Sequence, residues 1–113
     1  MKYCFGVDIG GTTVKIGLFK TDGELVDKWE IKTRTENKGE AILPDIAESL
    51  KKKMEEKGIE ASQMSGIGIG VPAPVDDNGV VQNTANLGWG YKEVNREMEE
   101  LTGLKVAAGN DAN

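Results

Sequence analysis

A short stretch near the start of the chain, Gly6-Val7-Asp8-Ile9-Gly10-Gly11-Thr12-Thr13-Val14-Lys15, constrains the fold more than any other feature. The apolar run from Tyr3 to Ile9 before the two adjacent glycines is typical of a mostly buried strand. After the glycines, apolar residues alternate with polar or small ones from Thr13 to Phe19, and this period of two predicts a second strand instead of a helix. The stretch is therefore predicted to be the turn of an antiparallel hairpin.

The rest of the chain continues as an alternation of strands and helices. A turn signal at Thr21-Asp22-Gly23 predicts a third antiparallel strand over Leu25 to Thr33. The patterns that follow predict a helix over Glu40 to Lys57 that starts near Ala41 to Leu43 because of Pro44, a strand over Ser65 to Val71, a short strand at Val80-Val81, a helix over about Lys92 to Thr102 and a strand over Leu104 to Ala108. Strands joined through helices should be parallel. The expected fold class is α/β, a mixed five-stranded sheet in which an antiparallel meander precedes parallel strands and packing helices.

Composition excludes several classes of partner. The formal net charge is −5, whereas binding to a nucleic-acid backbone needs a basic surface, so we expect no nucleic acid. No apolar run approaches the roughly 20 residues that a membrane-spanning helix needs. The single cysteine, Cys4, cannot form an internal disulfide, and the simplest expected location is the cytoplasm.

Two common phosphate-binding motifs do not fit the glycine-rich stretch. A Walker loop that started at Gly6 would place its second glycine at Gly11, but Thr12 then stands where the motif needs lysine. A dinucleotide-binding fingerprint opens a helix, whereas a strand is expected here.

The remaining motif is Asp-x-Gly-Gly-Thr-Thr at a strand–turn–strand. Glycines let a ligand approach the backbone, and threonine hydroxyls are neutral hydrogen-bond donors. Asp8 would repel a phosphate, so an acid at this position fits a phosphate site only if Mg²⁺ lies between them, usually held through its waters. A plain hairpin turn with a capping aspartate is the alternative reading of the same residues.

Four segments in this order resemble the ROK family (repressors, open reading frames and kinases) and its bacterial glucokinases, within the sugar-kinase, actin and chaperone ATPase superfamily. They are Val7-Asp8-Ile9-Gly10-Gly11-Thr12-Thr13-Val14-Lys15, Gly68-Ile69-Gly70-Val71-Pro72-Ala73-Pro74-Val75-Asp76, Thr84-Ala85-Asn86-Leu87-Gly88-Trp89 and Asn110-Asp111-Ala112-Asn113. Two positions depart from the family pattern: Ala73 replaces a usual glycine, and Gly109 replaces a residue that is commonly acidic.

The resemblance implies that residues 1–113 form the N-terminal lobe of an actin-like (ribonuclease H-like) ATPase whose C-terminal lobe is absent. It implies ATP-dependent phosphorylation of a hexose, with the conversion of glucose to glucose 6-phosphate as the first choice. In this reaction Asp111 would be the base that deprotonates the sugar. It also implies Mg²⁺ held through water by Asp8. The phosphates of ATP would be bound by Asp8, Gly10, Gly11, Thr12, Thr13 and Lys15, and the sugar by Ala73, Pro74, Thr84, Asn86, Asn110 and Asp111.

Several of these residues also have simpler interpretations. Asp111 could cap a helix, and Lys15 could be an ordinary exposed strand lysine. For Trp89 an apolar loop anchor is favoured over stacking on a sugar ring.

The expectations for the whole chain also leave alternatives. Without histidine and with one cysteine, the chain cannot build the zinc site that the resemblance places in the other lobe. We expect the isolated chain to be inactive and to form homo-oligomers. The alternative is a folded but catalytically inert lobe that binds phosphate weakly or self-associates. A ROK-type repressor is disfavoured, because those proteins carry a DNA-binding domain before the kinase core, whereas the first predicted strand here begins at Tyr3.

Overall fold

The computed structural model describes residues 2–82, 84 and 87–110, and of Asn110 only the backbone. Its strands and helices are, in chain order, β1 (Tyr3–Ile9), β2 (Thr13–Lys20), β3 (Leu25–Lys32), α1 (Glu36–Gly39), α2 (Ile42–Lys57), a 3-10 turn (Ala61–Gln63), β4 (Met64–Val71), β5 (Val80–Val81), β6 (Lys92–Glu93), α3 (Val94–Thr102) and β7 (Val106–Asn110). Five strands form one sheet in the order β3-β2-β1-β4-β7, and β5 pairs with β6. The predicted mixed sheet is confirmed.

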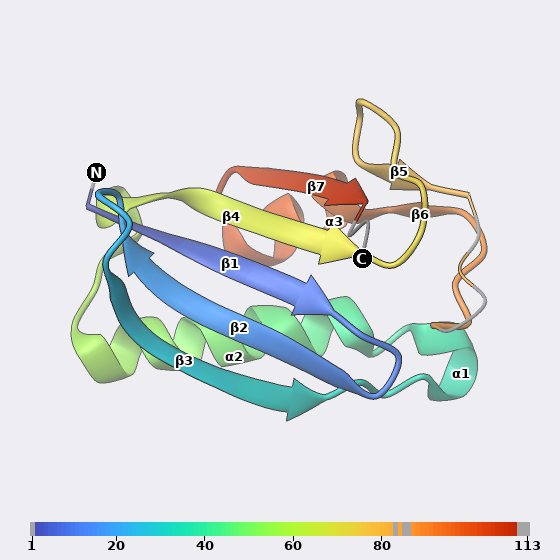
Figure 1. Cartoon of the computed structure of the whole chain (residues 1–113), viewed down its shortest axis with the longest axis horizontal. Coiled ribbons are helices and arrows are strands. Elements are labelled where there is room, and N and C mark those ends of the chain that lie inside the picture. The colour runs from blue at the N-terminus through green and yellow to red at the C-terminus, as the bar shows by residue number, and fades with distance from the viewer. Residues whose placement is uncertain (1, 83, 85–86, 111–113) are drawn as a thin grey trace.

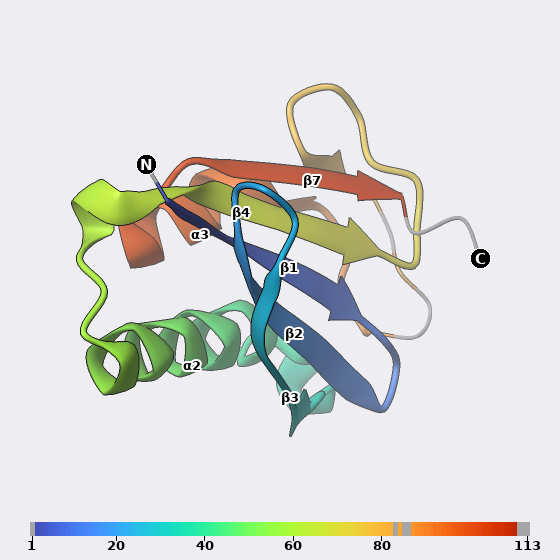
Figure 2. The same ribbon diagram turned by 60° about the vertical axis from the view of Figure 1, so that its left-hand side comes forward.

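The sheet order also decides where the helices lie. Strands β1, β2 and β3 pair antiparallel, whereas β4 is parallel to β1, and β7 is parallel to β4. The connections from β3 through α2 to β4 and from β4 through α3 to β7 cross the sheet in the same direction. Because such crossovers are almost always right-handed, both helices belong on one face, and Figures 1 and 2 show them there.

The core fills the space between this face and the helices. Alternate residues of the central strand, Phe5, Val7 and Ile9, are buried, as a period of two requires. The helix α2 contributes a stripe of fully buried apolar side chains, Ile42, Leu43, Ile46, Ala47 and Leu50. Each large side chain of this kind stabilises the fold by about 2 kcal/mol through burial.

The opposite face carries very small residues. In register across four strands lie Gly17 of β2, Gly6 of β1, Gly68 of β4 and Ala107 of β7. The ring of Phe19 lies against the two glycines of β1 and β2. No helix of the described residues covers this face (Figure 2). A pocket of about 720 Å³ lies on this face and reaches from Leu25 on β3 to Gly68 on β4.

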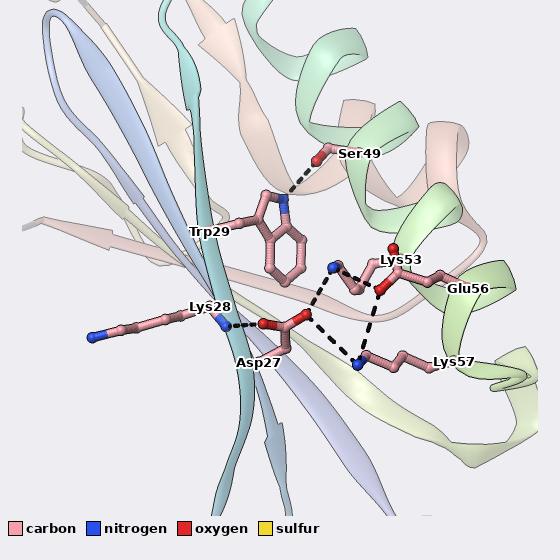
Figure 3. A network of polar contacts seen from close by, with 7 residues as sticks. All are labelled: Asp27, Lys28, Trp29, Ser49, Lys53, Glu56 and Lys57. Carbon is pink, nitrogen blue, oxygen red and sulfur yellow. Dashed lines mark hydrogen bonds and ion pairs between the residues drawn. The ribbon is translucent and has the colours of Figure 1, made fainter.

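A polar network fastens the edge strand β3 to α2 (Figure 3). Lys53 Nζ lies 2.7 Å from Asp27 Oδ2 and 4.7 Å from the centroid of the Trp29 ring. The indole N–H of Trp29 donates to Ser49 Oγ at 2.8 Å. The hydrogen bond from Lys53 lowers the pKa of the Asp27 carboxyl, and the same bond raises the pKa of the lysine.

Most element boundaries agree with the sequence, and two differ for identifiable reasons. Helix α2 starts at Ile42, within the predicted window. Lys92 and Glu93, expected as the start of a helix, instead pair with β5 before α3 begins at Val94. The last strand starts two residues later than predicted, because Leu104 N–H bonds to Thr102 Oγ1 and pairing with β4 begins only at Val106.

No helix in the described part of the chain is long and apolar enough to cross a membrane.

Candidate functional site

The carboxyl ends of β1, β4 and β7 meet at one edge of the sheet (Figure 1). Asp8 pairs in register with Gly70 of β4, which pairs with Gly109 of β7. Neighbouring strands are about 4.8 Å apart, so Asp8 and Gly109 lie about 10 Å from each other. Because the residue between them is a glycine, no side chain separates them on this face. Two of the four segments singled out in the sequence therefore converge here, together with the backbone of Asn110, the first residue of a third.

The glycine-rich stretch forms the β1–β2 hairpin turn, as predicted. The N–H of Gly10 donates to the carbonyl of Thr13 at 3.0 Å and closes the turn. A Cβ on Gly10 would lie only 2.8 Å from that same carbonyl oxygen, so the turn itself needs a glycine at this position. Gly11 and Thr12 at its tip are exposed, and Thr13 is half-buried.

Thr33, a residue that the sequence did not single out, holds this turn from beneath. Its side chain is 4% exposed, and its Oγ1 donates to the Gly10 carbonyl at 2.8 Å. Its backbone N–H donates to the Thr12 carbonyl at 2.9 Å. Nothing in the local pattern could have revealed this role, because a threonine at a strand end is common and its partners lie more than 20 residues earlier.

These bonds decide which groups of the turn face a ligand. The Gly10 N–H and the carbonyls of Gly10 and Thr12 are engaged within the protein. Gly11 and Thr12 are exposed residues of this turn, and Asp8, two residues before Gly10, is exposed as well. Neutral donors next to a carboxylate fit a phosphate bound together with a hydrated divalent cation. The turn is thus compatible with the phosphates of ATP and Mg²⁺.

Lys15 lies on β2 directly opposite Asp8. On its other side it faces Glu30 of β3, so it stands between two carboxylates on the open face of the sheet. This placement agrees with the simpler interpretation of Lys15 as an exposed strand lysine. Contact with a phosphate remains a prediction.

The residues expected on the sugar side are held by the loops after β4 and β5. Ala73 is 7% exposed and its N–H donates to Val71 O at 2.8 Å, whereas Pro74 is exposed. Thr84 is 3% exposed, and its Oγ1 accepts the backbone N–H of Trp89 at 3.2 Å. Sugar contacts at these positions stay predictions.

Trp89 is 2% exposed, as an apolar loop anchor should be. Its indole N–H donates to the carbonyl of Gly39 at 2.9 Å. Asn86 and Asp111 lie outside the described residues, and Asn110 is described by its backbone alone, as the last residue of β7.

Strand β7, which leads into the predicted catalytic segment, is held on its outer edge by side chains of α3. The N–H of Ala108 donates to Asn95 Oδ1 at 2.9 Å, and the N–H of Val106 donates to Glu99 Oε2 at 3.1 Å. These side chains replace the hydrogen bonds that a neighbouring strand would supply at a sheet edge. The sequence did not indicate this role for either residue.

The described residues hold no group of three or more histidine, cysteine, aspartate or glutamate side chains that could bind a metal directly. The predicted Mg²⁺ contact at Asp8 does not need one, because Mg²⁺ usually keeps several waters and takes only one or two carboxylates.

Comparison with known proteins gives a consistent result. The chain matches the model of the ROK family over residues 4–113. It is similar to the glucokinase of Halalkalibacterium halodurans, with 39% identity over 113 residues that cover 99% of this chain and 34% of that protein. It is also similar to the structure of a ROK family glucokinase from Streptomyces griseus in complex with glucose and AMPPNP. That match has a TM-score of 0.81 and 28% identity, and it covers 98% of this chain and 34% of the other.

A second solved structure, the ROK hexokinase from Thermus thermophilus, gives a TM-score of 0.78 at 32% identity and covers 98% of this chain and 36% of the other. The chain spans about a third of the length of the curated relatives that it matches. The family resemblance of the four segments is confirmed, because the family match extends over almost the whole sequence. The chain belongs to the ROK family.

Proposed function

We propose that residues 1–113 form the N-terminal lobe of a two-lobe kinase that transfers a phosphoryl group from ATP to a hexose, with glucose as the first substrate to test. The observation that carries this proposal is the row of paired residues Asp8, Gly70 and Gly109 at the edge of the sheet. It brings the glycine-rich turn to the same place as the ends of β4 and β7. The similarity to a glucokinase over 99% of the chain supports it.

In this proposal the turn binds the donor. Gly11, Thr12 and Thr13 contact the phosphates of ATP, while Gly10 shapes the turn and Lys15 adds positive charge nearby. Asp8 would hold Mg²⁺ through water, and the ion bound there would supply the neutralisation of phosphate charge that phosphoryl transfer requires.

The acceptor side follows from the resemblance. Asp111 takes the proton of the sugar's 6-hydroxyl, and Asn110 bonds a neighbouring hydroxyl. A positioned carboxylate base of this kind typically contributes about 10²–10⁴-fold to the rate. Thr84, Asn86 and the Ala73-Pro74 loop complete the sugar side.

The remaining two-thirds of such a kinase would supply the adenosine site and further sugar ligands. The chain alone is therefore inactive in this proposal. The proposed location of the kinase is the cytoplasm, where ATP is available.

The uncovered sheet face leads us to propose that the isolated chain self-associates. Its row of small residues and its pocket leave an apolar surface without a cover among the described residues. Light scattering at high micromolar concentration should give a mass above that of the monomer. Gly68→Glu should restore the monomer, because a side chain there has free space in the folded chain. A clean monomer for the unchanged protein would contradict this part of the proposal.

An assay that couples glucose 6-phosphate formation to a redox dye tests the main proposal. It compares the 113-residue chain with an extended protein in which the part of the Halalkalibacterium halodurans glucokinase that follows the matched segment is joined after Asn113. We expect activity in the extended protein only. Activity of the short chain alone would contradict the two-lobe proposal. Two inactive proteins, both folded by circular dichroism, would favour the alternative of a catalytically inert lobe.

A further inference from the structure

The segment between β3 and α2 connects two parts of the candidate site. We call residues 33–39 the brace. Its first residue, Thr33, is buried and gives two hydrogen bonds to the glycine-rich turn, one to the Gly10 carbonyl at 2.8 Å and one to the Thr12 carbonyl at 2.9 Å. The turn is thereby fixed to the start of the brace.

The last residue of the brace is fixed to Trp89. We use the name Thr84–Trp89 turn for the described residues 84 and 87–89 alone. The carbonyl of Gly39 accepts the indole N–H of Trp89 at 2.9 Å in a buried position. Trp89 also closes its own turn: its N–H donates to Thr84 Oγ1 at 3.2 Å, and its carbonyl accepts the Thr84 N–H at 2.9 Å. Figure 1 shows α1, the β1–β2 turn and the segment that leads into β6 gathered at the same end of the molecule.

The backbone of the brace is unusual. Asn37 and Lys38 have left-handed conformations, with φ of 53° and 61°, and Gly39 continues them with φ of 69°. A non-glycine residue in this region costs about 1–2 kcal/mol and persists only where neighbouring contacts enforce it. Those contacts are close, because a Cβ on Gly39 would collide with the Leu87 carbonyl and lie 2.9 Å from the Trp89 ring.

We propose that the brace holds the glycine-rich turn and the Thr84–Trp89 turn in one fixed relation, with Thr33 and Trp89 as positioning residues for the donor and acceptor sides. This proposal rests on the proposed function, in which the two turns serve ATP and hexose. Phosphoryl transfer depends chiefly on placing donor and acceptor in line, and a displacement of about 1 Å can cost about 100-fold in rate. A short, strained link with both ends buried is suited to this task.

The chain offers a matched control for Trp89. Trp29 also donates its indole N–H to a single acceptor, Ser49 Oγ at 2.8 Å, but on the β3–α2 side of the molecule. In the extended protein, Trp89→Phe should raise the KM for hexose about 5- to 10-fold and leave the KM for ATP within about 2-fold, as expected for one lost buried hydrogen bond. Trp29→Phe should change neither constant.

Thr33 is tested from the other side. Thr33→Val keeps the shape of the side chain but removes the hydroxyl, and it should raise the KM for ATP about 5- to 10-fold with little change for hexose. Thr33→Ser keeps the hydroxyl and should restore the KM of the unchanged protein. If Trp89→Phe and Trp29→Phe alter the constants equally, or if Thr33→Ser fails to rescue, the brace has no positioning role and the proposal is wrong.

A measurement on the 113-residue chain separates this proposal from the function on which it rests. The chain has two tryptophans, so its NMR spectrum contains two indole N–H signals, one from the brace partner Trp89 and one from the control Trp29. Thr33→Val should speed the solvent exchange of the Trp89 indole at the far end of the brace at least 5-fold, with the Trp29 signal unchanged. Equal exchange in both proteins would overturn the brace. If the extended protein has no kinase activity but Thr33→Val still speeds the exchange of the Trp89 indole, the kinase proposal is wrong and the positioning role of the brace is supported.

Discussion

Gly10 and Gly109 lie at the same edge of the sheet but differ in their tolerance for a side chain. A Cβ on Gly10 would lie 2.8 Å from the Thr13 carbonyl oxygen, whereas a Cβ on Gly109 would meet nothing within 4 Å. We predict that Gly10→Ala lowers the free energy of unfolding by about 1–3 kcal/mol, the usual cost of overpacking. Gly109→Ala should change it by less than about 0.5 kcal/mol.

Urea unfolding followed by circular dichroism measures both values. Equal stability of the two variants would show that the hairpin turn does not depend on the closeness of Gly10 to Thr13.

At the residue scale, the sequence identified groups that carry charge or lie in motifs and missed those that support them. Asp8 and the glycines stand out because their types are unusual in a strand end. Thr33 does not, since its role depends on hydrogen bonds to a turn far earlier in the chain. The left-handed Lys38 could not be foreseen either, because lysine has no preference for that conformation and its backbone lies close to Gly88, a residue 50 positions later.

At the scale of elements, the contact between β3 and α2 should make the stability of the protein depend on pH. Lys53 lowers the pKa of the Asp27 carboxyl, so the pair contributes fully above the ordinary carboxyl range and its contribution is lost as the pH falls through the lowered pKa. Lys53, whose pKa is raised, stays charged throughout this range.

We predict that Asp27→Asn lowers the stability at neutral pH and flattens its decline between about pH 5 and pH 2. Urea unfolding at several pH values checks this. Glu48→Gln, which removes an exposed ion pair to Lys52 at 3.4 Å, is the control and should change little. A decline in Asp27→Asn as steep as in the unchanged protein would exclude the β3–α2 pair as its source.

The edge of β7 allows a second prediction at this scale. Asn95 of α3 accepts the N–H of Ala108, two residues before the end of the strand. Asn95→Ala should therefore speed hydrogen exchange at the Ala108 amide by about 10-fold, while the Val106 amide, which is bonded to Glu99, should change less. Glu99→Ala should give the reverse pattern. If both amides respond equally to both variants, the strand opens as a unit and the side chains of α3 do not hold it point by point.

The elements themselves were largely predictable because periodicity is a local property. Alternation of apolar and small residues fixes β1, β2 and β4, and Pro44 marks the first turn of α2. The start of α3 was not predictable to the residue, since Lys92 and Glu93 pair with β5, and these partners lie 11 and 13 residues earlier in the chain.

At the scale of the whole molecule, the topology follows from the order of elements. Both crossovers advance in the same direction, so right-handedness alone puts α2 and α3 on one face and leaves the other with its row of small residues. The same topology brings the ends of β1, β4 and β7 to one edge. The convergence of the motifs in space could therefore be predicted, whereas the brace that links them could not.

The most direct test of the kinase proposal is the turnover rate of the extended protein and of its Asp111→Asn variant at saturating ATP, Mg²⁺ and glucose. The substitution keeps the size of the side chain and removes the base, so the rate should fall by about 10²–10⁴-fold, while the KM for ATP stays within a few-fold. A rate for Asp111→Asn within a few-fold of the unchanged protein would contradict the account, because the end of β7 would then not deliver the group that accepts the proton of the sugar.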